Sequence, residues 1–254
     1  MTGVVLGSAF SEPVLAGVRL RPQEVSTPWG AVTIWVHPQR GHVVFRHGVP
    51  HTHLPNQVPW RAHAWALREV GCEALLLTSS VGVLDAQLPL YEPLVLSDLL
   101  MPDNRLPDGS ACTVFDVERP GQGHLVVQAG LFDAELSEQL DGWLGERAPR
   151  AVFAYVGGPR TKTAAENRWW LAQGAQVNSM SVGPEVVLAN ELEIPVAGLA
   201  IGHKYSVAGR KDPLGHTAIA DSLVASRKAV VDLAERFLLE AEPVPFKNRI
   251  HRLR

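Results

Sequence analysis

Short apolar runs that alternate with helical patterns constrain the fold of this chain more than any other feature. The runs are short, apolar and partly β-branched, as is typical of buried strands, and they cover residues 3–6, 31–37, 42–45, 74–77, 94–96, 151–156 and 196–201. Helical spacing occurs over residues 56–70, 163–174, 184–192 and 218–239. Strands that alternate with helices predict a mostly parallel sheet with helices on both faces. We therefore expect one α/β domain over residues 1–254.

For the helix expected over residues 163–174, the spacing of alanines and a tryptophan predicts which side faces the core. Ala164, Ala165, Trp169 and Ala172 recur on one side of the helix, and we expect that side to pack inward. Gly174 follows as a C-terminal stop.

Composition and charge exclude several classes of protein. The formal net charge of -3 argues against a nucleic-acid coat or a membrane-surface protein. Two cysteines are too few for a disulfide scaffold or a multi-cysteine zinc site, and they suit a reducing compartment. No apolar run approaches the ~20 residues of a membrane span, and no basic region precedes the first apolar residues as in a signal peptide. We expect a cytoplasmic protein.

Small polar residues, glycines and an arginine follow the expected strands. They fall at Gly7-Ser8, Arg46-His47-Gly48, Thr78-Ser79-Ser80, residues 158–163, Met180-Ser181 and residues 203–206. The carboxyl ends of parallel strands meet at one edge of a sheet, where ligands bind. Hydroxyls, backbone N–H groups and a guanidinium suit an anion. The sequence therefore predicts an anion site, without the P-loop motif.

Several longer motifs occur in the same order. They are RHG at 46–48 with His51 and Pro55 beyond it, WRAH at 60–63, TSSVGVL at 78–84, GPR and TAAE within 158–166, and SMSVGPEVVLANE at 179–191. With this set the chain resembles the purine nucleoside phosphorylase family, and within it the methylthioadenosine phosphorylases. The resemblance implies a single α/β domain with a distorted mixed sheet, assembled as a homotrimer or a dimer of trimers. It also implies cleavage of an N-glycosidic bond by inorganic phosphate, with no further cofactor.

The resemblance assigns most of the site residues. The implied phosphate ligands are Ser8, Arg46, His47, Ser79, Ser80 and Ser181. On the sugar side, Met180 matches a methionine that packs on the ribose. His124 matches a histidine that a neighbouring subunit supplies at the 5′ end of the nucleoside.

The base site departs from the family pattern. Thr161 and Lys162 stand where the family has a stacking aromatic residue and then Glu or Ser. Residues His203-Lys204-Tyr205-Ser206 stand where methylthioadenosine phosphorylases have T-D-Y-D, so Lys204 and Ser206 replace two aspartates, one of which supports protonation of the leaving purine. An ammonium only donates hydrogen bonds. We therefore expect a pocket that suits a keto-rich or anionic base rather than adenine.

Three alternatives stay open at this point. A nucleosidase would use water and would need no anion site. A catalytically degenerate paralogue would bind a nucleoside or phosphorylated ligand without cleaving it. His51 and His53 beside His47 raise the question of a metal site, which the lack of a nearby carboxylate or cysteine disfavours.

Overall fold

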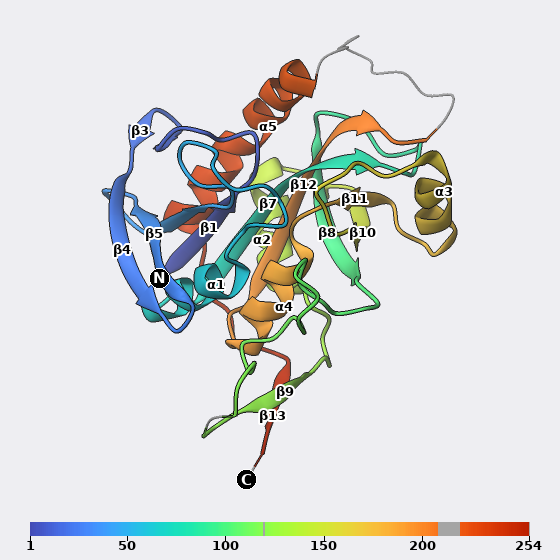
Figure 1. The fold of residues 1–254 in the computed structure, drawn as a ribbon. Coiled ribbons are helices and arrows are strands. Elements are labelled where there is room, and N and C mark those ends of the chain that lie inside the picture. Colours follow the sequence, from blue (N-terminus) through green and yellow to red (C-terminus); the bar gives the residue numbers. More distant parts are fainter. Residues whose placement is uncertain (119, 208–218, 254) are drawn as a thin grey trace.

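A computed structural model describes residues 1–118, 120–207 and 219–253, and its centre is one mixed sheet (Figure 1). The strand order is β11-β10-β8-β12-β7-β1-β6-β5-β4. Their bounds are β11 Val177–Ser179, β10 Arg150–Tyr155, β8 Pro93–Leu100, β12 Val196–Tyr205, β7 Ala74–Val83, β1 Thr2–Leu6, β6 His42–Phe45, β5 Gly30–Val36 and β4 Arg21–Thr27. β1 runs parallel to β6 and β7, and β7 runs parallel to β12, whereas the β4–β5, β5–β6 and β8–β12 pairs are antiparallel.

The sheet curls back on itself at one end. β11 pairs in parallel with β10 and also in antiparallel with β7, so β11, β10, β8, β12 and β7 close into a ring. The carboxyl ends of β7 and β12 meet in this ring, and the short antiparallel strand β11 lies beside them. The expected α/β class with a mixed, distorted central sheet is confirmed.

Helices cover both faces of the sheet. α1 (Trp60–Glu69) and α4 (Gly183–Glu191) pack on one face over a core that includes Trp60, Leu67 and Val186. α2 (Ala134–Leu144) and α5 (Ile219–Glu240) pack on the other, with Leu140 and Phe237 buried. Among the described residues, no helix is both long enough and apolar enough to cross a bilayer.

The third helix, α3 (Ala164–Ala172), lies at the periphery and corrects one prediction (Figure 1). Its alanines and Trp169 are exposed, and Asn167 on the opposite side is its one buried residue. The prediction that the alanine side faces the core is wrong, because alanine is favourable on any side of a helix, exposed or buried. A capping box between Thr163 and Glu166 begins the helix, and Gly174 follows it at a positive φ of 92°, as expected.

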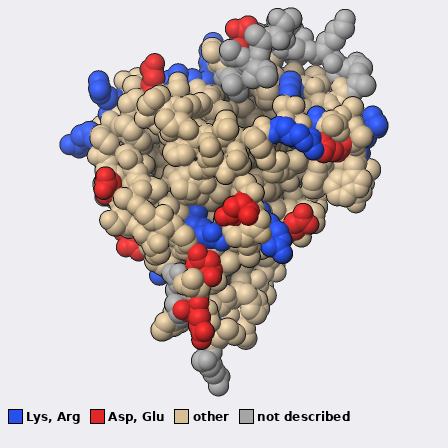
Figure 2. Space-filling model, in the orientation of Figure 1, with Lys and Arg blue, Asp and Glu red and all other residues tan. Residues whose placement is uncertain are grey.

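The hydrophobic pattern of the sequence did not predict several short elements. They are α2, β4, β11, β2 (Val14–Leu15), β3 (Val18–Arg19), β9 (Gly123–Val126) and β13 (Arg249–Arg252). β9 and β13 pair with each other and extend away from the sheet, at the bottom of Figure 1. The face of the molecule in Figure 2 carries charges of both signs around a broad uncharged centre.

Candidate active site

A cavity of about 570 Å³ opens at the carboxyl ends of the strands. It is lined by every predicted site residue except His124, namely Ser8, Arg46, His47, Ser79, Ser80, Thr161, Lys162, Met180, Ser181, His203, Lys204 and Ser206. Ser8 follows β1 and Arg46 follows β6, whereas Met180 and Ser181 follow β11. Twelve positions spread over two hundred residues of sequence therefore share one cavity.

Two strands are longer than the sequence indicated. β7 continues through Ser79 and Ser80 to Val83, and β12 continues through Lys204 to Tyr205. The two strands stay paired along this extension, apart from an irregularity between Gly202 and Lys204. The polar side chains of the extension border a cavity instead of an apolar core, so hydrophobicity gives no sign that the strands go on.

Arg46 is held in a fixed orientation inside the protein. It is 1% exposed, and its Nε and Nη2 donate to the two carboxylate oxygens of Glu185, each at 2.8 Å. Nη2 also donates to the carbonyl oxygen of Thr78 at 2.9 Å. Nη1 faces the first turn, since a Cβ at Gly7 would lie only 2.8 Å from it. The sequence reading assigned no role to Glu185, and only a contact with Arg46 could have revealed one.

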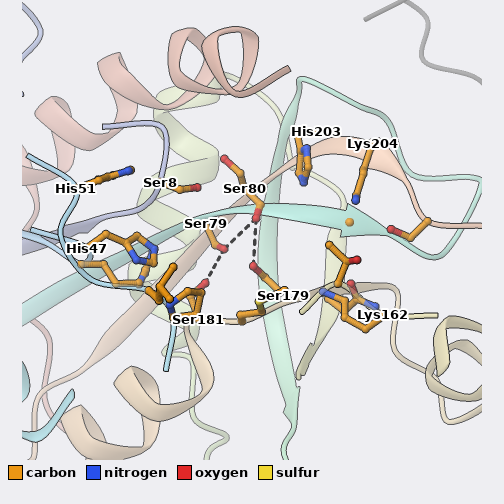
Figure 3. A pocket seen from close by; sticks show the side chains of 18 of the residues that line it. Ser8, His47, His51, Ser79, Ser80, Lys162, Ser179, Ser181, His203 and Lys204 are labelled. Carbon is orange, nitrogen blue, oxygen red and sulfur yellow. Dashed lines mark hydrogen bonds between the residues drawn. The ribbon is translucent and has the colours of Figure 1, made fainter. Parts of the chain in front are cut away.

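Four serines, Ser79, Ser80, Ser179 and Ser181, meet in the middle of the cavity (Figure 3). The hydroxyls of Ser79 and Ser181 are 2.9 Å apart, and Ser79 and Ser179 each donate to the carbonyl oxygen of Ser80 at 3.3 Å. Ser181 is positioned by a tight turn in which Val182 adopts φ 64° and ψ -51°, and the Gly183 N–H donates to the Ser181 carbonyl oxygen at 2.7 Å. A β-branched residue at positive φ is strained, and such strain is concentrated at functional sites.

Two histidines near this end of the cavity, His47 and His63, are uncharged at neutral pH. Burial and the Arg46 charge lower the pKa of His47 to about 4. Burial also lowers the pKa of His63, in α1, to about 3. His47 Nδ1 lies 3.0 Å from the His53 carbonyl oxygen, so Nδ1 carries the proton and Nε2 is an acceptor. In the described part of the chain, no cluster of three His, Cys, Asp or Glu side chains could hold a metal.

The opposite end of the cavity is cationic. Figure 3 shows Lys162, Lys204 and His203 at one end and His47 and His51 at the other. Burial first, and then the Lys204 charge, lower the pKa of Lys162 to about 8. Burial and the two lysines lower the pKa of His203 to about 4. Among the residues that the structure describes, no Asp or Glu lines the cavity.

Glu166, a carboxylate whose charge acts on Lys162, is already engaged. Glu166 accepts two hydrogen bonds from Arg160, at 2.6 and 2.9 Å, and one from the Thr163 N–H at 2.7 Å. These donors lower its pKa to about 2. Its charge raises the pKa of Lys162 only as a minor influence, after the opposing effects of burial and Lys204.

Two asparagines at the cationic end were not anticipated. Asn167 Nδ2 donates to the Ser206 carbonyl oxygen at 3.0 Å, and Asn178 Nδ2 donates to Asn167 Oδ1 at 3.0 Å. Both side chains are buried and both line the cavity. A buried asparagine inside the β11 pattern is the one sequence signal that could have drawn attention to them.

His124 lies apart from the cavity of its own chain. It is on β9, in register with His251 on β13, and the two rings are 5.1 Å apart. The resemblance assigned His124 to a neighbouring subunit's site, so its role there stays a prediction.

Known proteins resemble this chain over most of its length. Residues 5–239 match the family model of the phosphorylase superfamily. A probable 6-oxopurine nucleoside phosphorylase of Thermococcus kodakarensis is 30% identical, and the match covers 97% of this chain and 93% of that relative. An S-methyl-5'-thioadenosine phosphorylase of Mycolicibacterium smegmatis is 33% identical, over 79% of this chain and 75% of the relative.

A solved structure supports the same fold. The methylthioadenosine phosphorylase of Schistosoma mansoni in complex with adenine superposes with a TM-score of 0.75, at 24% identity, over 94% of this chain and 89% of that chain.

Proposed function

Because this chain belongs to the phosphorylase superfamily, we propose that it cleaves purine nucleosides with inorganic phosphate, releasing the free base and a pentose 1-phosphate. The observation that carries the proposal is the division of one cavity into two ends, with hydroxyls and Arg46 at one and two lysines at the other. A nucleoside needs such a cavity, because its sugar must lie between an anion and a base. No further cofactor takes part in this reaction.

The phosphate would bind where Arg46 faces the first turn. Arg46 Nη1, the hydroxyls of Ser8, Ser79 and Ser181, and the backbone and hydroxyl of Ser80 are the donors. Neutral His47 presents an acceptor at Nε2, so it suits a protonated phosphate oxygen or gains a proton when the anion binds. Glu185 offsets the charge of Arg46. Phosphate binding at this end would therefore depend more on hydrogen bonds than on net charge.

The sugar would lie over Met180, between the two ends. Met180 packs against the backbone of Gly158, where an added Cβ would come within 2.8 Å of its sulfur. In a homotrimer or a dimer of trimers, His124 of one subunit would close the 5′ end of a neighbour's cavity. The tip formed by β9 and β13 projects from the body of the subunit, which suits that role (Figure 1).

The base would lie among Thr161, Lys162, His203 and Lys204. In the chemical step, a phosphate oxygen forms a bond to C1′ while the bond from C1′ to the base nitrogen breaks. The electron pair of that bond goes to the base, which then takes up a proton from solvent. Two ammonium groups stabilise the negative charge on the departing base, with Lys204 and Ser206 at the positions where related enzymes have acids. Keto bases fit these donors and amino bases do not.

One experiment tests the proposal and its alternatives. Inosine, adenosine and methylthioadenosine are incubated with and without phosphate, and the released base is measured by chromatography. We expect release that requires phosphate and is faster for inosine. Release without phosphate would indicate a nucleosidase. Binding without release would indicate a degenerate paralogue, for which the lack of a carboxylate among the described cavity residues is the supporting observation.

A matched pair of variants tests the phosphate end. Ser181→Ala should raise the KM for phosphate, because Ser181 is buried against Ser79 in the cavity. Ser11→Ala, at an exposed position outside the cavity, should not. Equal phosphate KM values for the two variants would remove Ser181 from the phosphate site.

A further inference from the structure

Three adjacent strands place a lysine, a glycine and an asparagine in one row at the cationic end. Lys204 on β12 is in register with Gly82 on β7, and Asn178 on β11 is in register with the same glycine from the other side. Residues in register on neighbouring strands point to the same face of a sheet. Lys204 and Asn178 therefore flank Gly82, which lines the cavity and has no side chain to fill the space between them.

The space over Gly82 is bordered by polar atoms. A Cβ at Gly82 would lie 2.4 Å from Ser206 Oγ and 3.1 Å from Asn178 Oδ1. Asn178 is 0% exposed, and its Oδ1 has no hydrogen-bond partner among the described residues. A buried acceptor without a partner is costly, so its presence at a cavity wall points to a donor that the ligand brings.

Hydrogen bonds fix which atom of Asn178 is the acceptor. The Ser206 carbonyl oxygen can only accept, so the amide nitrogen of Asn167 must face it. The Asn167 oxygen then faces Asn178 and can only accept, so the nitrogen of Asn178 must face Asn167. Oδ1 of Asn178 is left as an acceptor at the cavity wall.

The two lysines supply donors around that acceptor. Lys162 approaches from the segment that precedes α3, and its charge and that of Lys204 repel each other. Glu166, the carboxylate that also acts on Lys162, is bound to Arg160. The described cavity residues at this end thus offer two cationic donors and the Asn178 acceptor, without a carboxylate to balance the lysines.

We propose that this end of the cavity recognises the nucleoside of a 2,6-dioxopurine, a xanthine-type base, through its imide edge O=C–NH–C=O. The inference rests on the function proposed above and names its substrate class. Each carbonyl oxygen accepts from one ammonium, and the N–H between them donates to Asn178 Oδ1. The nucleoside of such a base loses a ring proton near neutral pH, so its negative charge is balanced by the lysines.

Other purines fit this arrangement less well. Hypoxanthine has one carbonyl and leaves the second ammonium without an acceptor. Guanine and adenine turn an amino group toward the lysines, and two donors that face each other oppose binding. Such a site is selective because a base that does not match it leaves buried polar groups of the protein unpaired.

The test compares xanthosine with inosine and guanosine in the presence of phosphate. We expect kcat/KM for xanthosine to exceed that for inosine about tenfold or more, since one additional charge-assisted hydrogen bond is worth at least about a factor of ten. Lys162→Met and Lys204→Met should each reduce that ratio toward one. Lys228→Met, on the exposed surface of α5 and outside the cavity, should leave it unchanged.

Binding of free bases separates this inference from the proposed reaction. By calorimetry, xanthine should bind more tightly than hypoxanthine and than 1-methylxanthine, whose imide N–H is blocked. Asn178→Leu should remove the difference between xanthine and 1-methylxanthine. If inosine is cleaved as fast as xanthosine, the inference is wrong although the phosphorylase function stands. If no nucleoside is cleaved, the function is wrong, and equal binding of xanthine and hypoxanthine would then overturn the inference as well.

Discussion

Breaking the buried ion pair between Arg46 and Glu185 should be among the most costly single changes for both stability and phosphate binding. The two side chains are 1% and 6% exposed and share two hydrogen bonds of 2.8 Å. Replacing one partner leaves a buried charge unpaired, which costs about 3–5 kcal/mol. A typical domain has only about 5–15 kcal/mol of stability. Arg46→Met or Glu185→Met alone should therefore remove a fifth or more of it.

The double variant makes the prediction specific to the pair. With both residues replaced by methionine no charge stays buried, so the loss of stability should be smaller than for either single variant. The exposed pair Arg236–Glu240 on α5, with side chains 46% and 53% exposed, is the matched control. Breaking it should change stability by less than about 1 kcal/mol.

Urea denaturation followed by tryptophan fluorescence measures these differences, since the chain has seven tryptophans. Phosphate affinity is then measured by calorimetry at a temperature where each variant is folded. Arg46→Met should weaken phosphate by about 1.5–3 kcal/mol, as expected for a lost charge-assisted hydrogen bond. Single variants that lose less than about 1 kcal/mol, or losses that simply add in the double variant, would refute this account of the pair.

Three further predictions concern the base end and the assembly. Affinity for an oxopurine base should fall as pH rises through about 8, because the Lys162 ammonium, whose pKa is lowered to about 8, then loses its proton. Lys162→Arg should keep the affinity at higher pH. A pH-independent affinity in calorimetry would count against Lys162 as a donor. Methylthioadenosine should be cleaved with kcat/KM below about 10⁴ M⁻¹s⁻¹, and Lys204→Asp should raise activity on adenine nucleosides relative to oxopurine nucleosides. Sedimentation should show a trimer or a hexamer at micromolar concentration, and a species with the mass of one chain would contradict the assembly.

The sequence predicts the order of the elements well because most of them bury apolar faces. The runs at residues 42–45 and 151–156 correspond to β6 and β10, and Pro184 marks the first turn of α4 as expected. Prediction from hydrophobic periodicity fails for elements that bury little apolar surface against the core. α3 is exposed on the side expected to face the core, and β9 and β13 pair with each other away from the main sheet.

The proposed phosphate end is also within reach of sequence reasoning, since each of its residues belongs to a recognisable local motif. Ser8 and Arg46 reach one cavity because they follow the carboxyl ends of parallel strands, and Ser181 joins them from the end of β11, which runs antiparallel to β7. Glu185 was missed for a different reason. Its part is to orient Arg46 from a distance of 139 residues along the chain, and no local motif describes that contact.

The base end depends on strand register, which no single motif contains. Asn178 and Lys204 flank Gly82 only because β11 returns to pair with β7 after pairing with β10. A shift of one residue in either strand would turn the corresponding side chain to the other face of the sheet. The lysine at position 204 by itself suggests a degraded acid site. In register with Gly82 and opposite Asn178, the same lysine is one donor in the set that we propose for an imide, so the proposed recognition depends on the pairing of three strands and not on the loss of an aspartate.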